Sequence, residues 1–233
     1  MNKQSNSYTV IYIIIMVVVV GVALAYTSMA LKDRQNDNVA ADKMRQILSS
    51  LRIAPDQDVK AQFASIISDQ YLVNDQGQRI EGDAFAVNMA NEVKKPAKER
   101  QLPVYEARLA DGSLKYIIPV YGTGLWGPIW GYIALDDDAS TIFGAFFNHE
   151  GETPGLGAEI TKPTFSDQFQ GKHIMVDSKL LPVEVVKAGQ KPSTGAEYVD
   201  GISGGTITSK GVSAMLADCF TPYNAFLQSL RNK

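Results

Sequence analysis

Ten residues near the C-terminal end, Asp200 to Ser209, read DGISGGTITS and combine three glycines with a row of hydroxyl groups. Glycine lets a ligand approach the main chain closely. A glycine-rich turn that opens a helix presents unpaired N–H groups and the positive end of the helix dipole, which favour a phosphate. The simpler interpretation is an N-cap after a loop. The hydroxyls that can cap the helix, bind a phosphate or become bonded to it belong to Ser203, Thr206, Thr208 and Ser209.

The first seven of these residues, Asp200 to Thr206, resemble the flavin-attachment motif Asp-Gly-x-Ser/Thr-Gly-Ala-Thr of the FMN-binding domain family. In that family a flavin transferase moves FMN from FAD onto the last threonine of the motif as a phosphoester. The resemblance therefore implies that Thr206 carries covalent FMN. One position departs from the pattern, because this chain has Gly205 where the family usually has alanine. Glycine is smaller, so it should not block attachment.

A second segment, HEGETPGLGAEI from His149 to Ile160, resembles the part of these domains that holds the isoalloxazine ring. By itself it predicts only a tight loop. Its fitness for a ring lies in Gly155 and Gly157, which let backbone groups reach the flavin edge, and in the apolar Leu156. The alternative of a metal cluster is disfavoured, since no further His or Cys lies nearby in the sequence.

A third segment, GTGLWGPIWGYIAL from Gly122 to Leu135, predicts a strand with buried aromatics. It also resembles the C subunits of sodium-translocating NADH:quinone oxidoreductases, in which case Trp126 stacks near the flavin. The ring-binding residues that these resemblances imply are Leu125, Trp126, Glu152, Thr153, Leu156 and Gly157. Those implied for the phosphoester end are Ser203, Gly204, Gly205, Thr206, Thr208, Ser209 and Lys210.

The roles expected of these side chains are modest, because the cofactor carries the electron and the protein supplies position, dielectric and hydrogen bonds. Thr206 serves as an anchor and Lys210 balances the charge of the phosphodiester. We expect no catalytic side chain and no metal site. Cys219 is expected to be a small buried residue rather than a redox group.

Composition narrows the class of protein. The chain has 233 residues, of which 45% are hydrophobic and 20% charged, with a net charge of −3. The absence of a basic excess argues against nucleic acid as a partner. One cysteine and two histidines exclude a disulfide scaffold and leave too few ligands for a Cys/His zinc site.

The N-terminal segment predicts a membrane anchor over 1–34, with a transmembrane helix at about residues 8–31. No residue from Gln4 to Leu31 carries a charge, and about 20 apolar residues span a bilayer. The alternative is a cleaved signal peptide ending near Ala23–Ala25, but the apolar run is too long for a signal core.

The charges beside the anchor favour a cytoplasmic domain, because positive residues stay inside. Only Lys3 precedes the anchor, whereas the residues after it include Lys32, Arg34, Lys43 and Arg45. Family membership implies the opposite, a domain on the periplasmic side of the bacterial inner membrane. We follow the family, since large domains translocate regardless of such counts.

The remaining chain predicts a helical stalk over 35–72 and an FMN-binding domain over 73–233. Helical periodicity extends through DVKAQFASIISDQYL, residues 58–72, and returns at 209–230. Strand pairs are expected about Asp111–Gly112 and about 136–138. The fold class is α+β, with one anchor helix and one soluble domain of antiparallel sheet and flanking helices.

The function that the resemblance implies is an electron relay within a sodium-translocating NADH:quinone oxidoreductase, a translocase, with no complete reaction from this chain alone. The partners implied are the B, D and E subunits, the flavin transferase during maturation, and the lipid bilayer. Two alternatives stay open. One is the G subunit of an Rnf complex, which moves electrons between ferredoxin and NAD. The other is a membrane-anchored binding domain that holds no flavin.

Overall fold

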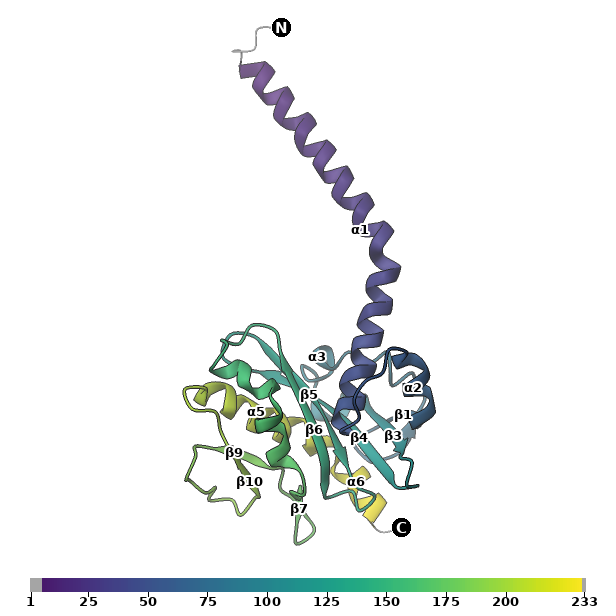
Figure 1. Ribbon diagram of the computed structural model, residues 1–233, viewed down its shortest axis with the longest axis vertical. Coiled ribbons are helices and arrows are strands. Elements are labelled where there is room, and N and C mark those ends of the chain that lie inside the picture. Colours follow the sequence, from purple (N-terminus) through teal and green to yellow (C-terminus); the bar gives the residue numbers. More distant parts are fainter. Residues whose placement is uncertain (1–5, 232–233) are drawn as a thin grey trace. The chain divides into compact units, whose positions relative to one another are not determined.

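A six-stranded antiparallel sheet forms the centre of the fold in a computed structural model that describes residues 6–231 (Figure 1). The strand order is β2-β1-β3-β4-β5-β6, so that β3 to β6 follow one another as hairpins. The strands are β1 Ile67–Val73, β2 Arg79–Ile80, β3 Leu102–Arg108, β4 Leu114–Thr123, β5 Pro128–Leu135 and β6 Ile142–His149. The predicted α+β class, with an antiparallel sheet and flanking helices, is confirmed.

The other elements are helices and two small sheets. The α-helices are α1 Asn6–Ser50, α2 Val59–Ile66, α3 Met89–Glu92, α4 Pro163–Ser166, α5 Thr206–Phe220 and α6 Asn224–Arg231. Short 3-10 turns are η1 Ala97–Glu99, η2 Gly157–Thr161, η3 Asp167–Phe169 and η4 Thr221–Tyr223. The small sheets pair β7 Met175–Val176 with β8 Lys179–Leu180, and β9 Glu184–Val186 with β10 Tyr198–Asp200. The β9–β10 pair lies beside α5 (Figure 1).

The two predicted hairpin turns are confirmed, and local chemistry explains both. Between β3 and β4, Gly112 adopts φ 83° and the Asp111 carboxylate accepts a hydrogen bond from Ser113 N at 2.9 Å. Between β5 and β6, the carboxylate of Asp138 accepts from the backbone and the hydroxyl of Thr141. Aspartate and glycine therefore close these turns without help from distant residues.

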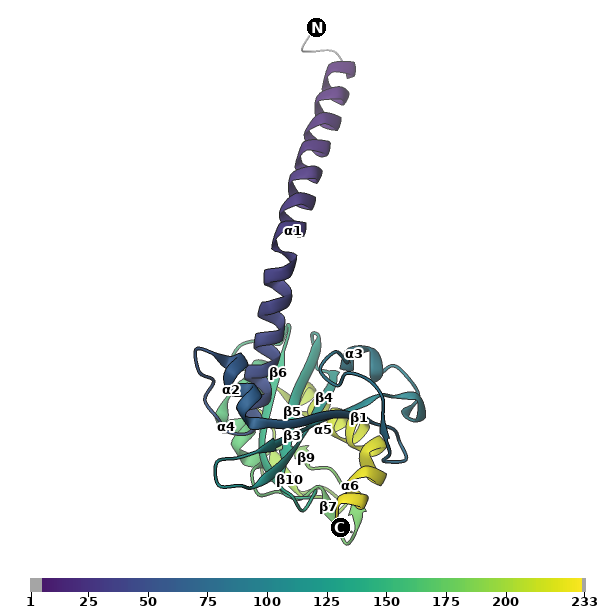
Figure 2. The same ribbon diagram turned by 90° about the vertical axis from the view of Figure 1, so that its right-hand side faces the viewer.

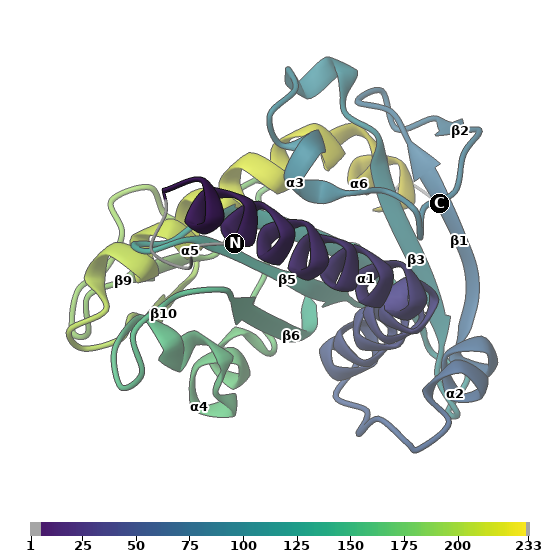
Figure 3. The ribbon, with the colours of Figure 1, turned by 90° about the horizontal axis from the view of Figure 1, so that it is seen from above.

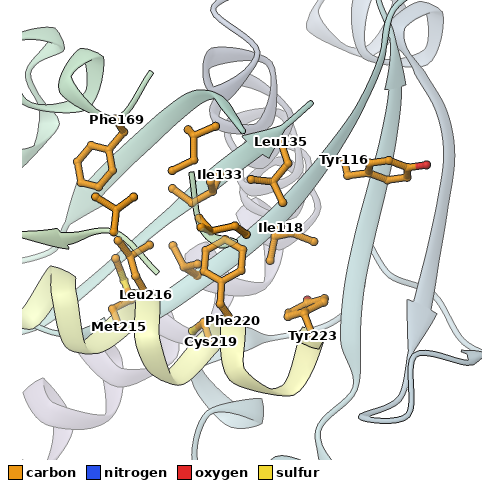
Figure 4. Close-up of a cluster of buried hydrophobic side chains, with 14 of the residues drawn as sticks. Tyr116, Ile118, Ile133, Leu135, Phe169, Met215, Leu216, Cys219, Phe220 and Tyr223 are labelled. Carbon is orange, nitrogen blue, oxygen red and sulfur yellow. The ribbon is translucent and has the colours of Figure 1, made fainter. Parts of the chain in front are cut away.

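The main core lies between the sheet and α5. Figure 4 shows the apolar side of α5, with Met215, Leu216 and Phe220, directed toward Ile118 and Ile133 of the sheet. Phe220 is fully buried. Residues three and four apart on a helix share one face, so this spacing lets a single stripe cover the sheet.

The opposite face of the sheet is covered by the last turn of α1 and by α2. Trp130 and Ile129 are neighbours on β5, so their side chains point to opposite faces. Trp130 Nε1 donates to Gln46 Oε1 of α1 at 3.0 Å, while Ile129 belongs to the main core. In the view from above, α5 and α6 lie on one side of the central strands and α2 lies on the other (Figure 3). Residue Ser50 also lies close to Gly144 of β6.

The small β7–β8 hairpin lies beside α6 at the end of the domain near the C-terminus (Figure 2). Lys179 and Leu180 share a groove with Thr221, Asn224 and Gln228. This hairpin lies outside the six-stranded sheet.

Two expected helices differ from the structure. The stretch predicted as helical to residue 72 is helical only to Ile66, and Ile67 starts β1. β1 pairs with both β2 and β3, and its residues Tyr71 and Leu72 are buried, so sheet pairing overrides the local helical pattern. The C-terminal helix is interrupted at η4, where Pro222 has no N–H to continue the α-helical bonds.

The N-terminal helix α1 extends across the boundary expected at residue 34. It is long and apolar enough to cross a membrane, by length and composition, and none of its most apolar window is buried. By contacts, the chain divides between Lys43 and Met44 into two units. Lys3, which entered the charge count, lies outside the described residues. The domain limits at 34 and 72 stay predictions.

Truncating Phe220 to alanine should destabilise the domain, because it leaves a cavity between α5 and the sheet. We expect the free energy of unfolding to fall by about 3–5 kcal/mol. Chemical denaturation of the detergent-solubilised chain measures this. Gln228→Ala, at an exposed position of α6, is the control and should change stability by less than about 0.5 kcal/mol. Equal effects in the two variants would contradict the assignment of the core.

Candidate functional site

The sheet brings the three chemically suggestive segments to one edge. β5 and β6 are antiparallel, and Ile129 near the start of β5 pairs with His149 at the end of β6. The turn before β5, which holds Leu125 and Trp126, therefore lies beside the loop that follows β6. The start of α5 lies at the same edge, because Thr208 of its first turn bonds to Glu152 of that loop.

Glu152 connects the three segments through one carboxylate. Its Oε1 accepts a hydrogen bond from the backbone N–H of Trp126 at 2.8 Å, and its Oε2 accepts from Thr208 Oγ1 at 2.5 Å. Its own backbone N–H donates to His149 Nδ1 at 3.2 Å. Glu152 is 5% exposed and Thr208 is 1% exposed. We call Glu152, Trp126 and Thr208, joined in this way, the Glu152 cluster.

The Glu152 carboxyl remains ionised despite this burial. Burial by itself raises its pKa, but the hydrogen bonds from Thr208, Trp126 and Leu125 outweigh burial and hold the pKa below its usual value of 4.5. Each of these donors binds the charged form more strongly than the neutral form. The site therefore contains a fixed negative charge.

Glycines leave the space that the Glu152 cluster occupies. A Cβ added at Gly124 would lie 2.5 Å from Glu152 Oε1, and one at Gly157 would overlap both Glu152 Oε2 and Thr208 Oγ1. Gly204 has φ 75°, and its Cβ would lie 2.5 Å from Leu156. These three positions therefore need glycine for close approach, and Gly204 also needs it for its backbone conformation.

A cavity of about 380 Å³ opens beside the Glu152 cluster. Its volume falls within the range of small-molecule sites. The residues that line it are Leu125, Trp126, Glu152, Thr153, Leu156, Gly157, Gly204, Gly205, Thr206, Ile207 and Thr208. Its large apolar side chains are exposed at the surface, with Trp126 at 69% and Ile207 at 56%.

A second cavity of about 580 Å³ lies against the same loop. It is lined by three further residues of the expected set, Ser203, Ser209 and Lys210. Gly204 and Thr206 line both cavities, so Thr206 stands between them. The structure thus divides the thirteen expected residues into an apolar group and a polar group on the two sides of Thr206.

Two threonines of α5 differ in the availability of their hydroxyls. Thr206 is exposed and is the first residue of the helix, whereas the Thr208 hydroxyl is buried and bonded to Glu152. Ser209 is also occupied, because its Oγ accepts from Ile202 N at 3.0 Å. In the described part of the chain, the Thr206 hydroxyl has no hydrogen bond to another residue.

Gly205 is the N-cap of α5 and has φ −103°, which any residue can adopt. An added Cβ would lie 3.1 Å from the Ile202 side chain and 3.3 Å from Gly157 N. Alanine, the family's usual residue, would therefore require a shift of a few tenths of an ångström. The glycine at this position gives the loop more room between Ile202 and Gly157.

Sequence reasoning missed several lining residues. Ile207 stands between two expected hydroxyl residues and contributes an exposed apolar side chain to the smaller cavity. Lys187 lies just after β9 and lines the larger cavity, together with Ser213 of α5. Alternation within PVEVVKA predicts a strand but gives no sign that its end meets α5.

The side chains present fit a phosphorylated aromatic ligand. The N-terminus of α5 has free N–H groups and the positive end of its dipole beside an unpartnered hydroxyl, which suits a phosphoryl group. The smaller cavity offers apolar side chains for a planar ring. Among residues 6–231, no group of three or more His, Cys, Asp or Glu side chains could hold a metal ion.

Residues 124–221 match the family model of the FMN-binding domain, a range that includes every expected site residue. The fold and site therefore define a protein with an FMN-binding domain.

Three similar proteins share a more specific name, as the C subunit of Na⁺-translocating NADH-quinone reductase. The Vibrio anguillarum protein is 31% identical over 227 residues, covering 91% of this chain and 89% of that protein. The Pseudomonas aeruginosa protein is 31% identical over 255 residues, covering 99% and 98%. The crystal structure of the Parabacteroides distasonis protein is 46% identical, covers 84% of this chain and 96% of that chain, and superposes with a TM-score of 0.80.

The chain belongs to the family of C subunits of Na⁺-translocating NADH-quinone reductases. This confirms the resemblance inferred from the Trp126 segment and favours this family over the Rnf G subunit. The match to the FMN-binding domain likewise disfavours a binding domain without flavin.

Replacing Thr208 by valine should weaken the whole site, because the Glu152 carboxylate then loses a buried donor. We expect the free energy of unfolding to fall by about 1–3 kcal/mol. Thr206→Val is the matched control, since its hydroxyl is exposed and makes no protein bond, and should change stability by less than about 0.5 kcal/mol. Denaturation of the unflavinylated chain tests this; a larger loss in Thr206→Val would contradict it.

The stabilising effect of the Glu152 charge should depend on pH in one direction. Because the pKa of Glu152 is lowered by folding, its contribution is complete above about 4.5 and is lost as the pH falls through the folded-state pKa. We therefore expect wild type to exceed Glu152→Gln in stability at pH 7, and the difference to shrink below pH 4.5. Urea denaturation at a series of pH values measures this. A difference that grows toward acid pH would contradict the hydrogen-bonding scheme.

Proposed function

We propose that this chain carries FMN as a phosphoester on Thr206 and acts as an electron relay in its complex. The observation that carries the proposal is the contrast between two hydroxyls. Thr206 is exposed at the first position of α5 and borders both cavities, while Thr208 is buried and bonded to Glu152. Family membership and the FMN-binding domain match support the identity of the cofactor.

The start of α5 favours the phosphoryl end of the cofactor. A phosphodiester on Thr206 carries a negative charge, which the N–H groups and dipole at a helix N-terminus stabilise. Ser203 and Lys210 line the adjoining larger cavity, where a hydroxyl and an ammonium group suit phosphate oxygens. Gly204 and Gly205 let the backbone approach that group, and Ser209 holds the loop through Ile202.

The smaller cavity suits the flavin ring. Trp126, Leu125 and Leu156 offer exposed apolar surface that a planar ring would cover. Thr153 and Gly157 lie at the cavity wall, where backbone groups can reach the ring edge. Bound FMN supplies a centre that accepts and releases electrons, while these residues bind it, orient it and exclude water.

The partners and location belong to the same proposal. Exposed apolar residues along α1, including Val10 to Leu24, suit a lipid bilayer. We propose the bacterial inner membrane, the soluble domain on the periplasmic side, and the B, D and E subunits as neighbours. A flavin transferase supplies the FMN from FAD. The proposed division is an anchor over 1–34, a stalk over 35–72 and an FMN-binding domain over 73–233.

Thr206→Val should abolish covalent flavin, because it removes the oxygen that forms the phosphoester. The chain is expressed with and without a flavin transferase and denatured. In-gel fluorescence and intact mass then detect attached FMN. We expect wild type with the transferase to gain the mass of one FMN less one water, and Thr206→Val to gain none.

Thr208→Val and Ser203→Ala are the matched controls and should keep the added mass. Loss of covalent flavin in Thr208→Val together with retention in Thr206→Val would show that Thr206 is the wrong acceptor. A wild-type chain that gains no mass with an active transferase would overturn the proposal as a whole.

A further inference from the structure

The charge of Glu152 is unusual for its position. Its carboxylate is buried, yet both oxygens are bonded by neutral donors, a backbone N–H and a hydroxyl. No Lys or Arg of the described residues pairs with it. A buried carboxylate is usually matched by a cation. Here the negative charge is stabilised but not cancelled.

We propose that the fixed negative charge of Glu152, in the wall of the smaller cavity, lowers the reduction potential of the bound flavin. This inference rests on the proposed function, because it needs FMN in that cavity. Glu152 acts here as a residue that tunes the cofactor, and its bonds and protonation do not change during electron transfer.

The physical argument is electrostatic. When a one-electron donor reduces the flavin, the flavin gains one negative charge unless a proton follows. A nearby carboxylate repels that charge, and the repulsion is stronger inside a protein than in water. The electron therefore arrives less favourably, and the potential is lower than it would be with a neutral residue at this position.

The glycines make the charge stay in place. Because side chains at Gly124 and Gly157 would overlap the Glu152 cluster, the backbone closes directly around the carboxylate. Glu152 also receives support from its own backbone bond to His149. The carboxylate therefore has little freedom to turn toward solvent, where water would screen its charge.

Two roles of Glu152 can be separated by experiment. A purely structural role predicts that any break in the Glu152 cluster loosens the cavity and moves the potential in the same direction. A role through charge predicts opposite directions for two variants. Glu152→Gln removes the charge and keeps the shape, whereas Thr208→Val keeps the charge and removes one donor that stabilises it.

The test uses the full chain, matured with the flavin transferase and purified in detergent. Dithionite titration with redox mediators at pH 8 measures the one-electron potential of the attached flavin. For Glu152→Gln we expect the equilibrium constant for reduction to rise at least about tenfold, which is about 59 mV for one electron. For Thr208→Val we expect a fall in potential.

Glu150→Gln is the matched control, because Glu150 lies two residues away and is exposed to solvent. Its potential should equal that of wild type, since water screens an exposed charge. Rises of similar size in Glu152→Gln and Thr208→Val would overturn the inference in favour of a structural role. If Glu152→Gln does not fold, Thr208→Val decides alone, and an equal or higher potential overturns the inference.

Failure of this inference is distinct from failure of the proposed function. A wild-type chain without added FMN mass would refute the function before any potential is measured. A chain that carries FMN on Thr206, with the same potential in wild type and Glu152→Gln, would refute only the role of the Glu152 charge.

Discussion

The site depends on one buried carboxylate. Glu152 bonds to Trp126 of the β4–β5 turn and to Thr208 in the first turn of α5, and so joins segments that are far apart in sequence. A buried carboxylate without donors would cost several kcal/mol, so the three segments are held together by mutual need. This constraint also explains Gly124 and Gly157, whose missing side chains make room for the carboxylate.

The sheet supplies the rigid support for this arrangement. The hairpin of β5 and β6 brings the turn at Trp126 next to the loop at Glu152. The apolar stripe of α5 then fixes the start of that helix at the same edge, with Phe220 in the core and Thr206 at the surface. Core packing and site geometry are therefore consequences of the same helix position. The exposed apolar rim, with Trp126 and Ile207, is the surface that this leaves for a ligand.

Several expectations followed from sequence because their causes are local. Asp111–Gly112 closes a hairpin through its own backbone preferences, and the uncharged run to Leu31 specifies a helix that can cross a membrane. Others failed because their causes are distant. The chain after Ile66 keeps a helical pattern but becomes β1, since β3 offers it a partner. Lys187 was missed because only the folded chain brings the end of β9 to α5.

The sequence by itself determined the family, the anchor and the glycine-hydroxyl motif before α5, because these depend on composition and on residues close together in the chain. Tertiary structure alone decided which hydroxyls are free. Thr206 and Thr208 are two residues apart and chemically alike, but a helix turns them to different directions, one to solvent and one to Glu152. Local sequence cannot distinguish them, since the carboxylate that occupies Thr208 comes from a loop fifty-six residues earlier.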